Sequence, residues 1–128
     1  MGNRTANLGW TTLITASTSD VFIPASGWMS TAGFRQFRPV VEIADRTGGI
    51  DVTPAYQVAN TYDDPQAFHG MGATLTSDGY HFPAAYTDPT SGTSNVTEFQ
   101  LVRFGYKVSV ASGTGHARVA ASVQIVTE

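Results

Sequence analysis

The chain contains no cysteine among its 128 residues, and only 13% of them are charged. The absence of cysteine excludes the disulfide framework of a small secreted module. Seven basic residues scattered through a chain of net charge −3 provide no concentrated positive patch for nucleic acid. No apolar run approaches the roughly 18 residues of a membrane-spanning helix. We therefore expect neither a nucleic-acid partner nor a membrane partner.

The N-terminal sequence MGNRTANLGW lacks the basic and apolar regions of a signal peptide, so we expect no secretory leader. Residues 1–9 show no periodicity and are predicted to form an extended arm. Such an arm either frays or reaches onto a neighbouring subunit, and its deletion is expected to leave the fold nearly intact. The remaining residues, 10–128, are long enough to bury a core as a single domain.

Two segments near the C-terminus have apolar residues at every second position. They are Val102, Phe104, Tyr106, Val108 and Val110 in the first segment, and Ala117, Val119, Ala121, Val123 and Ile125 in the second. A period of two indicates strands with one buried face. The short glycine-containing turn between them predicts an antiparallel hairpin. The apolar parity changes near Leu101 and Val102, which predicts a β-bulge there.

A second hairpin is predicted from residues 34–44 and 50–59, joined by the turn sequence DRTGG. Phe37, Val41 and Ile43 share the expected inner face of the first strand. Pro39 and Pro54 lack the N–H group that a sheet ladder requires, so each is expected at an edge or a bulge.

The rest of the chain has short strand-forming segments separated by turns. We expect strands over residues 10–16, 20–24, 73–76 and 80–83, the last two paired as a hairpin, and loops over residues 60–69 and 86–95. No amphipathic helix longer than a turn or two is present. The pattern predicts an all-β protein, an antiparallel β-sandwich with jelly-roll-like topology.

The residues able to bind metal lack the spacing of a metal site. His69, His81 and His116 are far apart in sequence, and the adjacent carboxylates Asp63 and Asp64 do not form a calcium-loop pattern. We therefore predict no metal and no cofactor.

The sequence also lacks a pattern for catalysis. It contains no nucleophile elbow for a serine hydrolase. Glu42 and Asp51 lie opposite each other in the predicted second hairpin, but on its polar face, as expected of an exposed pair rather than two carboxylates across a cleft. We predict that the protein is not an enzyme.

Aromatic residues are the remaining candidates for a functional surface. Those in or beside predicted loops are Trp10, Trp28, Tyr62, Phe68, Tyr80, Phe82 and Tyr86. We select Trp10, Trp28, Tyr80 and Tyr86 as candidate ligand or interface residues. Such rings either stack on sugars or fill the ends of the sandwich and subunit interfaces.

In overall character the chain resembles the small structural proteins of tailed-phage virions. The resemblance rests on the missing leader, the absence of cysteine, a low-charge surface rich in Thr, Ser, Gly and Ala, and the all-β pattern. It is carried by the stretches FRPVVEIADRTGGIDVTPAYQ and TEFQLVRFGYKVSVASGTGHARVAASVQIV. It implies a capsid decoration or cement protein, or another head or tail component, assembled into virions in the host cytoplasm. The implied partners are other copies of the chain, the major capsid protein lattice, or both.

A carbohydrate-binding β-sandwich module is the alternative. A row of exposed aromatic rings on one face would favour a glycan partner, whereas aromatic rings within a large apolar contact would favour assembly.

Overall fold

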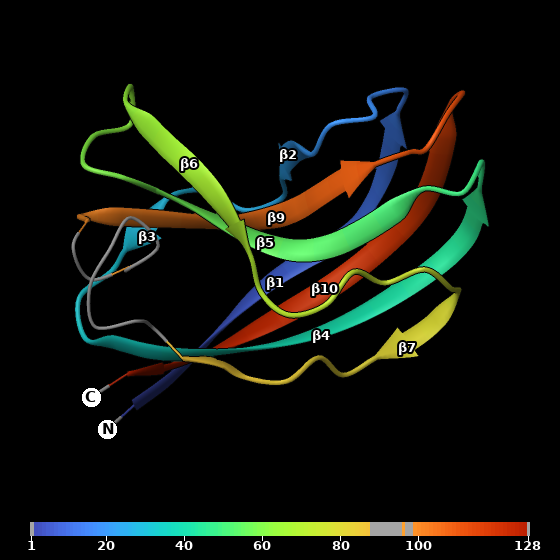
Figure 1. Ribbon diagram of the computed structural model, residues 1–128. Helices are drawn as coiled ribbons and strands as arrows, with labels where there is room; N and C mark the ends of the chain where they lie inside the picture. The colour runs from blue at the N-terminus through green and yellow to red at the C-terminus, as the bar shows by residue number, and fades with distance from the viewer. Residues whose placement is uncertain (1, 88–95, 97–98, 128) are drawn as a thin grey trace.

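The computed structural model describes residues 2–87, 96 and 99–127, which form two antiparallel sheets packed face to face (Figure 1). The strands are β1 (Gly2–Thr15), β2 (Val21–Pro24), β3 (Met29–Ser30), β4 (Phe34–Thr47), β5 (Asp51–Ala59), β6 (Pro65–Gly70), β7 (Gly79–His81), β8 (Tyr86–Thr87), β9 (Leu101–Ser109) and β10 (Gly115–Thr127). This part of the chain has no α-helix, and so none long and apolar enough to cross a membrane. The predicted antiparallel β-sandwich is confirmed.

The strand order is that of a jelly roll. Sheet A has the order β1-β10-β4-β7, with β8 also beside β4, and sheet B has the order β2-β9-β5-β6, with β3 also beside β9. The chain crosses from one sheet to the other after β1, β3, β4, β6, β8 and β9, so most consecutive strands belong to different sheets. The two ends of the chain lie side by side, because Gly2 pairs with Thr127 (Figure 1).

The inner faces of the two sheets form one apolar core, with the residue parity that the sequence predicted. The ten alternating apolar residues of the two C-terminal segments are all buried, and so are Phe37, Val41 and Ile43 of β4. Aromatic rings connect the layers: the ring of Phe104 in sheet B meets that of Phe37 in sheet A edge-on, with centroids 5.0 Å apart. Such a contact adds to the free energy gained by burying both rings.

Both predicted hairpins are wrong, although their strands are right. β9 belongs to sheet B and β10 to sheet A, and likewise β5 belongs to sheet B and β4 to sheet A. A hairpin would place both apolar faces of a pair on the same side of one sheet. Crossing between sheets instead turns the two apolar faces toward each other, so each buries the other. A short glycine-containing turn serves either connection.

The two crossing turns meet at the end of the sandwich away from the termini. Gly48, in the turn after β4, packs on the backbone of Thr114 and Gly115, which follow β9. A Cβ atom placed on Gly48 would lie 2.2 Å from the carbonyl oxygen of Thr114. Gly48 also has a φ of +68°, a conformation that favours glycine. This position therefore needs glycine for two independent reasons.

Residues 1–9 were expected to form an arm outside the domain, but Gly2–Gly9 form the first part of β1. This segment pairs with β10 along its length, with a register shift between Asn7 and Gly9. Ala6 and Leu8 are buried in the core. The sequence did not reveal this because the shift breaks the alternation. Deleting the segment would remove core residues and expose an edge of β10.

The two prolines lie in interior strands, at points where one neighbour is missing among the described residues. Pro39 of β4 falls between Phe37, the last residue paired with β8, and Val41, the first paired with β7. Pro54 of β5 lies one residue beyond the ladder with β6, and its carbonyl oxygen accepts a hydrogen bond from the Met71 N–H at 2.7 Å. The prediction allowed an edge or a bulge or break: neither strand is at an edge, but each proline lies where the ladder with one neighbouring strand is interrupted.

Three shorter segments also differ from expectation. Residues 65–70, predicted as loop, form β6 and pair with β5. Leu75 bridges to β5 whereas β7 pairs with β4, so residues 73–83 do not form a hairpin. β9 begins at Leu101 and its register with β5 has no shift, so the predicted bulge is absent. Residues 86 and 87 form β8, and the rest of the predicted loop, residues 88–95, lies outside the described residues.

Among the described residues, the buried polar side-chain atoms without a hydrogen-bond partner are the Tyr106 hydroxyl oxygen and the His69 Nε2 atom. Burial raises the pKa of Tyr106 above the ordinary value of about 10. Tyr106→Phe is therefore expected to leave stability unchanged at neutral pH or raise it by about 1 kcal/mol. Urea unfolding at pH 7 measures this difference. A loss above about 1 kcal/mol would show that the hydroxyl contributes to the fold.

The same substitution is expected to alter the response to alkali. Since the unfolded chain releases the Tyr106 proton first, ionisation of this group lowers the stability of the folded protein as pH rises above about 10. The Tyr106→Phe protein should lose less stability between pH 7 and about pH 10.5. Tyr62→Phe is the control, because Tyr62 is exposed.

Candidate functional site

The four selected aromatic residues lie in three different places. Trp10 and Tyr80 are on the outer face of sheet A, with 51% and 68% of their surfaces exposed. Trp28 is half-buried on the outer face of sheet B. Tyr86 is half-buried against the core, where its hydroxyl hydrogen-bonds the Tyr56 hydroxyl at 2.7 Å. The structure thus places only Trp10 and Tyr80 on a common surface.

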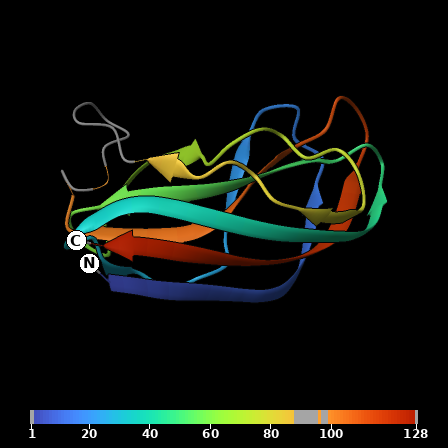
Figure 2. The same ribbon diagram turned by 90° about the horizontal axis from the view of Figure 1, so that it is seen from below.

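Trp10 and Tyr80 stand at the two ends of one row across sheet A. Trp10 of β1 is opposite Ala120 of β10, Ala120 is opposite Glu42 of β4, and Glu42 is opposite Tyr80 of β7. Residues directly opposite each other in a sheet point to the same side. With neighbouring strands about 4.8 Å apart, the two aromatic residues are separated by roughly 14 Å. β1, β10 and β4 lie side by side in the view of Figure 2.

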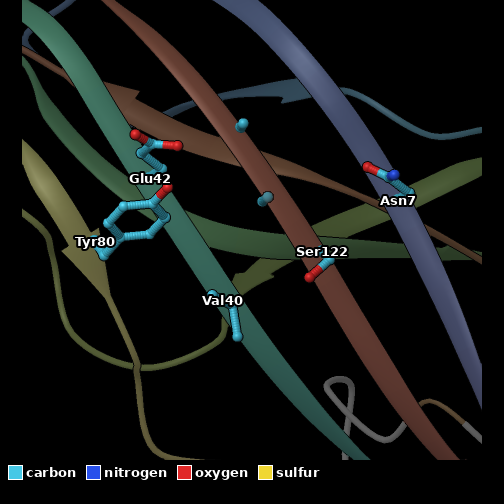
Figure 3. Close-up of a pocket in the computed structure, with 7 residues that line it drawn as sticks. Asn7, Val40, Glu42, Tyr80 and Ser122 are labelled. Carbon is cyan, nitrogen blue, oxygen red and sulfur yellow. The ribbon is translucent and has the colours of Figure 1, made fainter.

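A shallow hollow of about 280 Å³ lies within this face. Its lining residues are Asn7, Val40, Glu42, Tyr80, Ala120, Ala121 and Ser122. The outward residues of β10 at its centre are small, whereas Glu42 on the neighbouring strand β4 and Tyr80 on β7, beyond β4, are large. Figure 3 shows the ring of Tyr80 beside the carboxylate of Glu42, with Ser122 and Val40 between these residues and Asn7. The hollow therefore results from the order of side-chain sizes across three strands.

The polar groups of the hollow are available for a ligand. Among the described residues, Glu42, Tyr80 and Ser122 make no hydrogen bond or ion pair through their side chains. The Asn7 side-chain oxygen accepts a hydrogen bond from the Gly9 N–H at 3.0 Å, which leaves its NH₂ group free to donate. The hollow thus offers acceptors, donors and an aromatic ring together.

Glu42 is not paired with Asp51 as the predicted hairpin required. Asp51 is on β5 in sheet B, where its carboxylate lies 3.8 Å from the Arg46 guanidinium. Glu42 is on the outer face of sheet A. The arrangement follows from the crossing of the chain between the sheets after β4.

The outer face of sheet B is covered by its own side chains. The Arg103 guanidinium stacks over the Trp28 ring at 4.5 Å and donates two hydrogen bonds to the Gln57 side-chain oxygen. Phe22 and Phe68 stack with their centroids 5.7 Å apart. Partial burial lowers the pKa of Arg103 from its ordinary value. These groups satisfy one another, so this face offers less to a ligand than sheet A does.

The candidate metal ligands do not converge in the part of the chain that the structure describes. No group of three or more His, Asp or Glu residues there could hold a metal ion. His81 contacts the Ser77 carbonyl oxygen at 2.8 Å, and the His69 ring packs on Tyr56.

No family model matches the chain, and no curated protein matches it significantly. Solved structures do match. The chain is similar in fold to infectious bursal disease virus VP2. The VP2 subviral particle aligns over 98% of this chain with a TM-score of 0.57 and 9% identity. Structures of the Gx and Gt strains of that virus align over 96%, with TM-scores of 0.56 and 0.54 and identities of 11% and 8%.

This likeness establishes the fold alone, and the chain spans only 32–33% of the length of those viral chains. The shared feature is the two-sheet sandwich, since the alignments cover 96–98% of this chain. The structural neighbours are thus proteins of virus particles.

Sequence reasoning selected Tyr80 but missed the residues that surround it. Glu42, Ser122 and Asn7 are on three strands that are distant in sequence, and only the order β1-β10-β4 brings them together. The available signal was the run of small residues Ala120, Ala121 and Ser122 between Val119 and Val123 of β10.

Proposed function

We propose that the protein is a non-enzymatic structural component of a virus particle, present in many copies, as a capsid decoration or cement protein or a related head or tail component. The observation that carries the proposal is the alignment of 98% of the chain with VP2 of a subviral particle, in the same two-sheet fold. Jelly-roll sandwiches are frequent in viral capsids. The low charge of the chain supports the proposal, because interface cores are depleted in charged residues.

The contact between copies that we propose uses the β1 side of sheet A. β1 is at an edge of the sheet order, and its outward residues include Trp10 and Ile14, of which 51% and 61% is exposed. An edge strand of this length, with apolar residues beside it, is a ready template for association. A second copy, or the capsid protein beneath a bound layer, is the occupant that these features suit.

Ile14→Lys tests this contact. It is expected to weaken association at least roughly tenfold, because it places a charge within an apolar contact. Thermal unfolding should be almost unchanged, since the side chain is exposed. Size-exclusion chromatography with light scattering, over a roughly hundredfold range of concentration, measures the association.

Tyr62→Lys is the matched control, because Tyr62 is as exposed as Ile14 but lies in the connection between β5 and β6. Co-sedimentation of the wild type and of both variants with purified virions tests attachment to a particle. A wild-type protein that is monomeric at every concentration and does not sediment with virions would contradict the proposed function.

A further inference from the structure

We propose that the hollow on the outer face of sheet A is a binding site for one neutral sugar ring of a glycan. The site is lined from β1, β4, β7 and β10, and it has a volume of about 280 Å³. It belongs to the isolated chain, so the inference does not depend on the proposed role in a virus particle.

The Tyr80 side chain provides the surface on which a sugar ring would stack. It is 68% exposed at the end of the cross-strand row, beside Glu42 (Figure 3). The C–H groups on one face of a pyranose are apolar and pack on an aromatic ring, while its hydroxyl groups point outward from the rim. Val40, on the same strand as Glu42, adds a second apolar contact.

The polar groups match the hydroxyl groups of a sugar in kind. Glu42 can accept two hydrogen bonds from neighbouring hydroxyls, the Asn7 NH₂ group can donate, and Ser122 can do either. Within the described part of the protein, the Glu42 carboxylate, the Asn7 NH₂ group and the Ser122 hydroxyl make no hydrogen bond. A sugar hydroxyl both donates and accepts, so it can use all three.

Other ligand classes suit this set of groups less well. Phosphate and acidic sugars are disfavoured, because Glu42 is the only charged residue that lines the hollow. A purely apolar ligand would leave the carboxylate and the amide unpaired. A Lys or Arg side chain from a partner would satisfy Glu42 and stack on Tyr80 but would not use the Asn7 donor.

The cross-strand row that contains Tyr80 also indicates the direction in which a longer glycan would extend from the site. It continues over Ala120 to Trp10 on β1, so a glycan longer than one residue would extend across the strands toward a second ring. One face of that ring is already covered, since the Arg118 guanidinium lies 5.0 Å from its centroid. A single sugar in this open site should bind weakly, with a Kd on the order of 1 mM, and an oligosaccharide more tightly.

The test is a titration of the isotopically labelled full-length protein with neutral oligosaccharides, followed by NMR. The probes are hexasaccharides of glucose in α- and β-linkage, of mannose, of galactose and of N-acetylglucosamine. At least one is expected to cause saturable shifts of the Glu42, Ala120 and Ser122 amides. Tyr80→Ala should weaken this binding at least roughly tenfold and Glu42→Gln roughly fivefold.

Tyr62→Ala is the matched control, because Tyr62 is also 68% exposed but lies outside the hollow, and it should leave the affinity within roughly twofold of wild type. The folding of each variant is checked by its amide spectrum. Absence of saturable shifts with every probe up to about 20 mM would overturn the inference. Glycan binding that Tyr80→Ala does not weaken would also overturn it. So would a wild-type protein that binds no glycan while Tyr80→Ala changes its oligomeric mass.

Discussion

Phe104→Ala is expected to lower the free energy of unfolding by about 3–5 kcal/mol. Phe104 is completely buried at the centre of the sandwich, and its ring meets Phe37 of the opposite sheet edge-on at 5.0 Å. Truncation to alanine removes this contact between the layers and leaves a cavity that the surrounding strands can only partly fill. A loss of this size is a large fraction of the stability of an ordinary domain. Urea unfolding followed by circular dichroism measures it.

Phe82→Ala is the control, since 74% of the Phe82 surface is exposed. Its unfolding free energy is expected to stay within about 0.5 kcal/mol of wild type. If the Phe104→Ala protein unfolded cooperatively within about 1 kcal/mol of wild type, the assignment of this parity of β9 to the core would be wrong.

Gly48→Ala is expected to destabilise the protein by about 2–5 kcal/mol. Part of this cost is the left-handed backbone, which a residue with a Cβ adopts at a cost of about 1–2 kcal/mol. The other part is overpacking, about 1–3 kcal/mol, because the new Cβ would lie 2.2 Å from the Thr114 carbonyl oxygen and 2.6 Å from the Gly115 Cα. Those are backbone atoms of the other crossing turn, so neither turn can move without displacing its strands.

The neighbouring residue separates these two costs. Gly49 has the same φ of +68°, but a Cβ atom there would have no neighbour within 4 Å. Gly49→Ala should therefore lose only the backbone part, about 1–2 kcal/mol. Equal losses for the two variants would contradict the close packing of the crossing turns. Differential scanning calorimetry of the pair measures the difference.

Local pattern in the sequence was sufficient to predict which residues of the long strands are buried. Alternation over residues 102–110 and 117–125 reports burial directly, because a strand that packs on one side must place every second side chain in the core. The same reasoning identified Phe37 and Val41 of β4. It failed for β6, because the sequence PQAFHG has no alternation.

The partners of those strands were not predictable from local pattern. DRTGG and SGTGH are both compatible with a hairpin or with a crossing between sheets, and the choice depends on where each apolar face finds its complement. The pairing of Gly2–Gly9 with β10 depends on residues more than a hundred positions away. Which strands pair over such distances in sequence depends on the packing of the whole core.

The candidate site was less predictable than the fold for the same reason. Tyr80 could be selected because a large aromatic residue beside a turn stands out in the sequence. Glu42, Ser122 and Asn7 have ordinary surroundings in sequence, and they form a hollow only because β10 lies between β1 and β4. A site that is built across strands has no linear motif.

The position of β10 also fixes when this domain can fold during synthesis. β1 and β4 are made early, but the strand that must lie between them, β10, is translated last. Until residues 115–127 have left the ribosome, both early strands expose apolar faces and lack their main ladder partner, whereas β5 and β6 can already pair with each other. Folding dominated by such distant pairings takes on the order of milliseconds to seconds. The newly made chain therefore passes through an interval in which sheet B is partly formed and sheet A is open to aggregation or to chaperone binding.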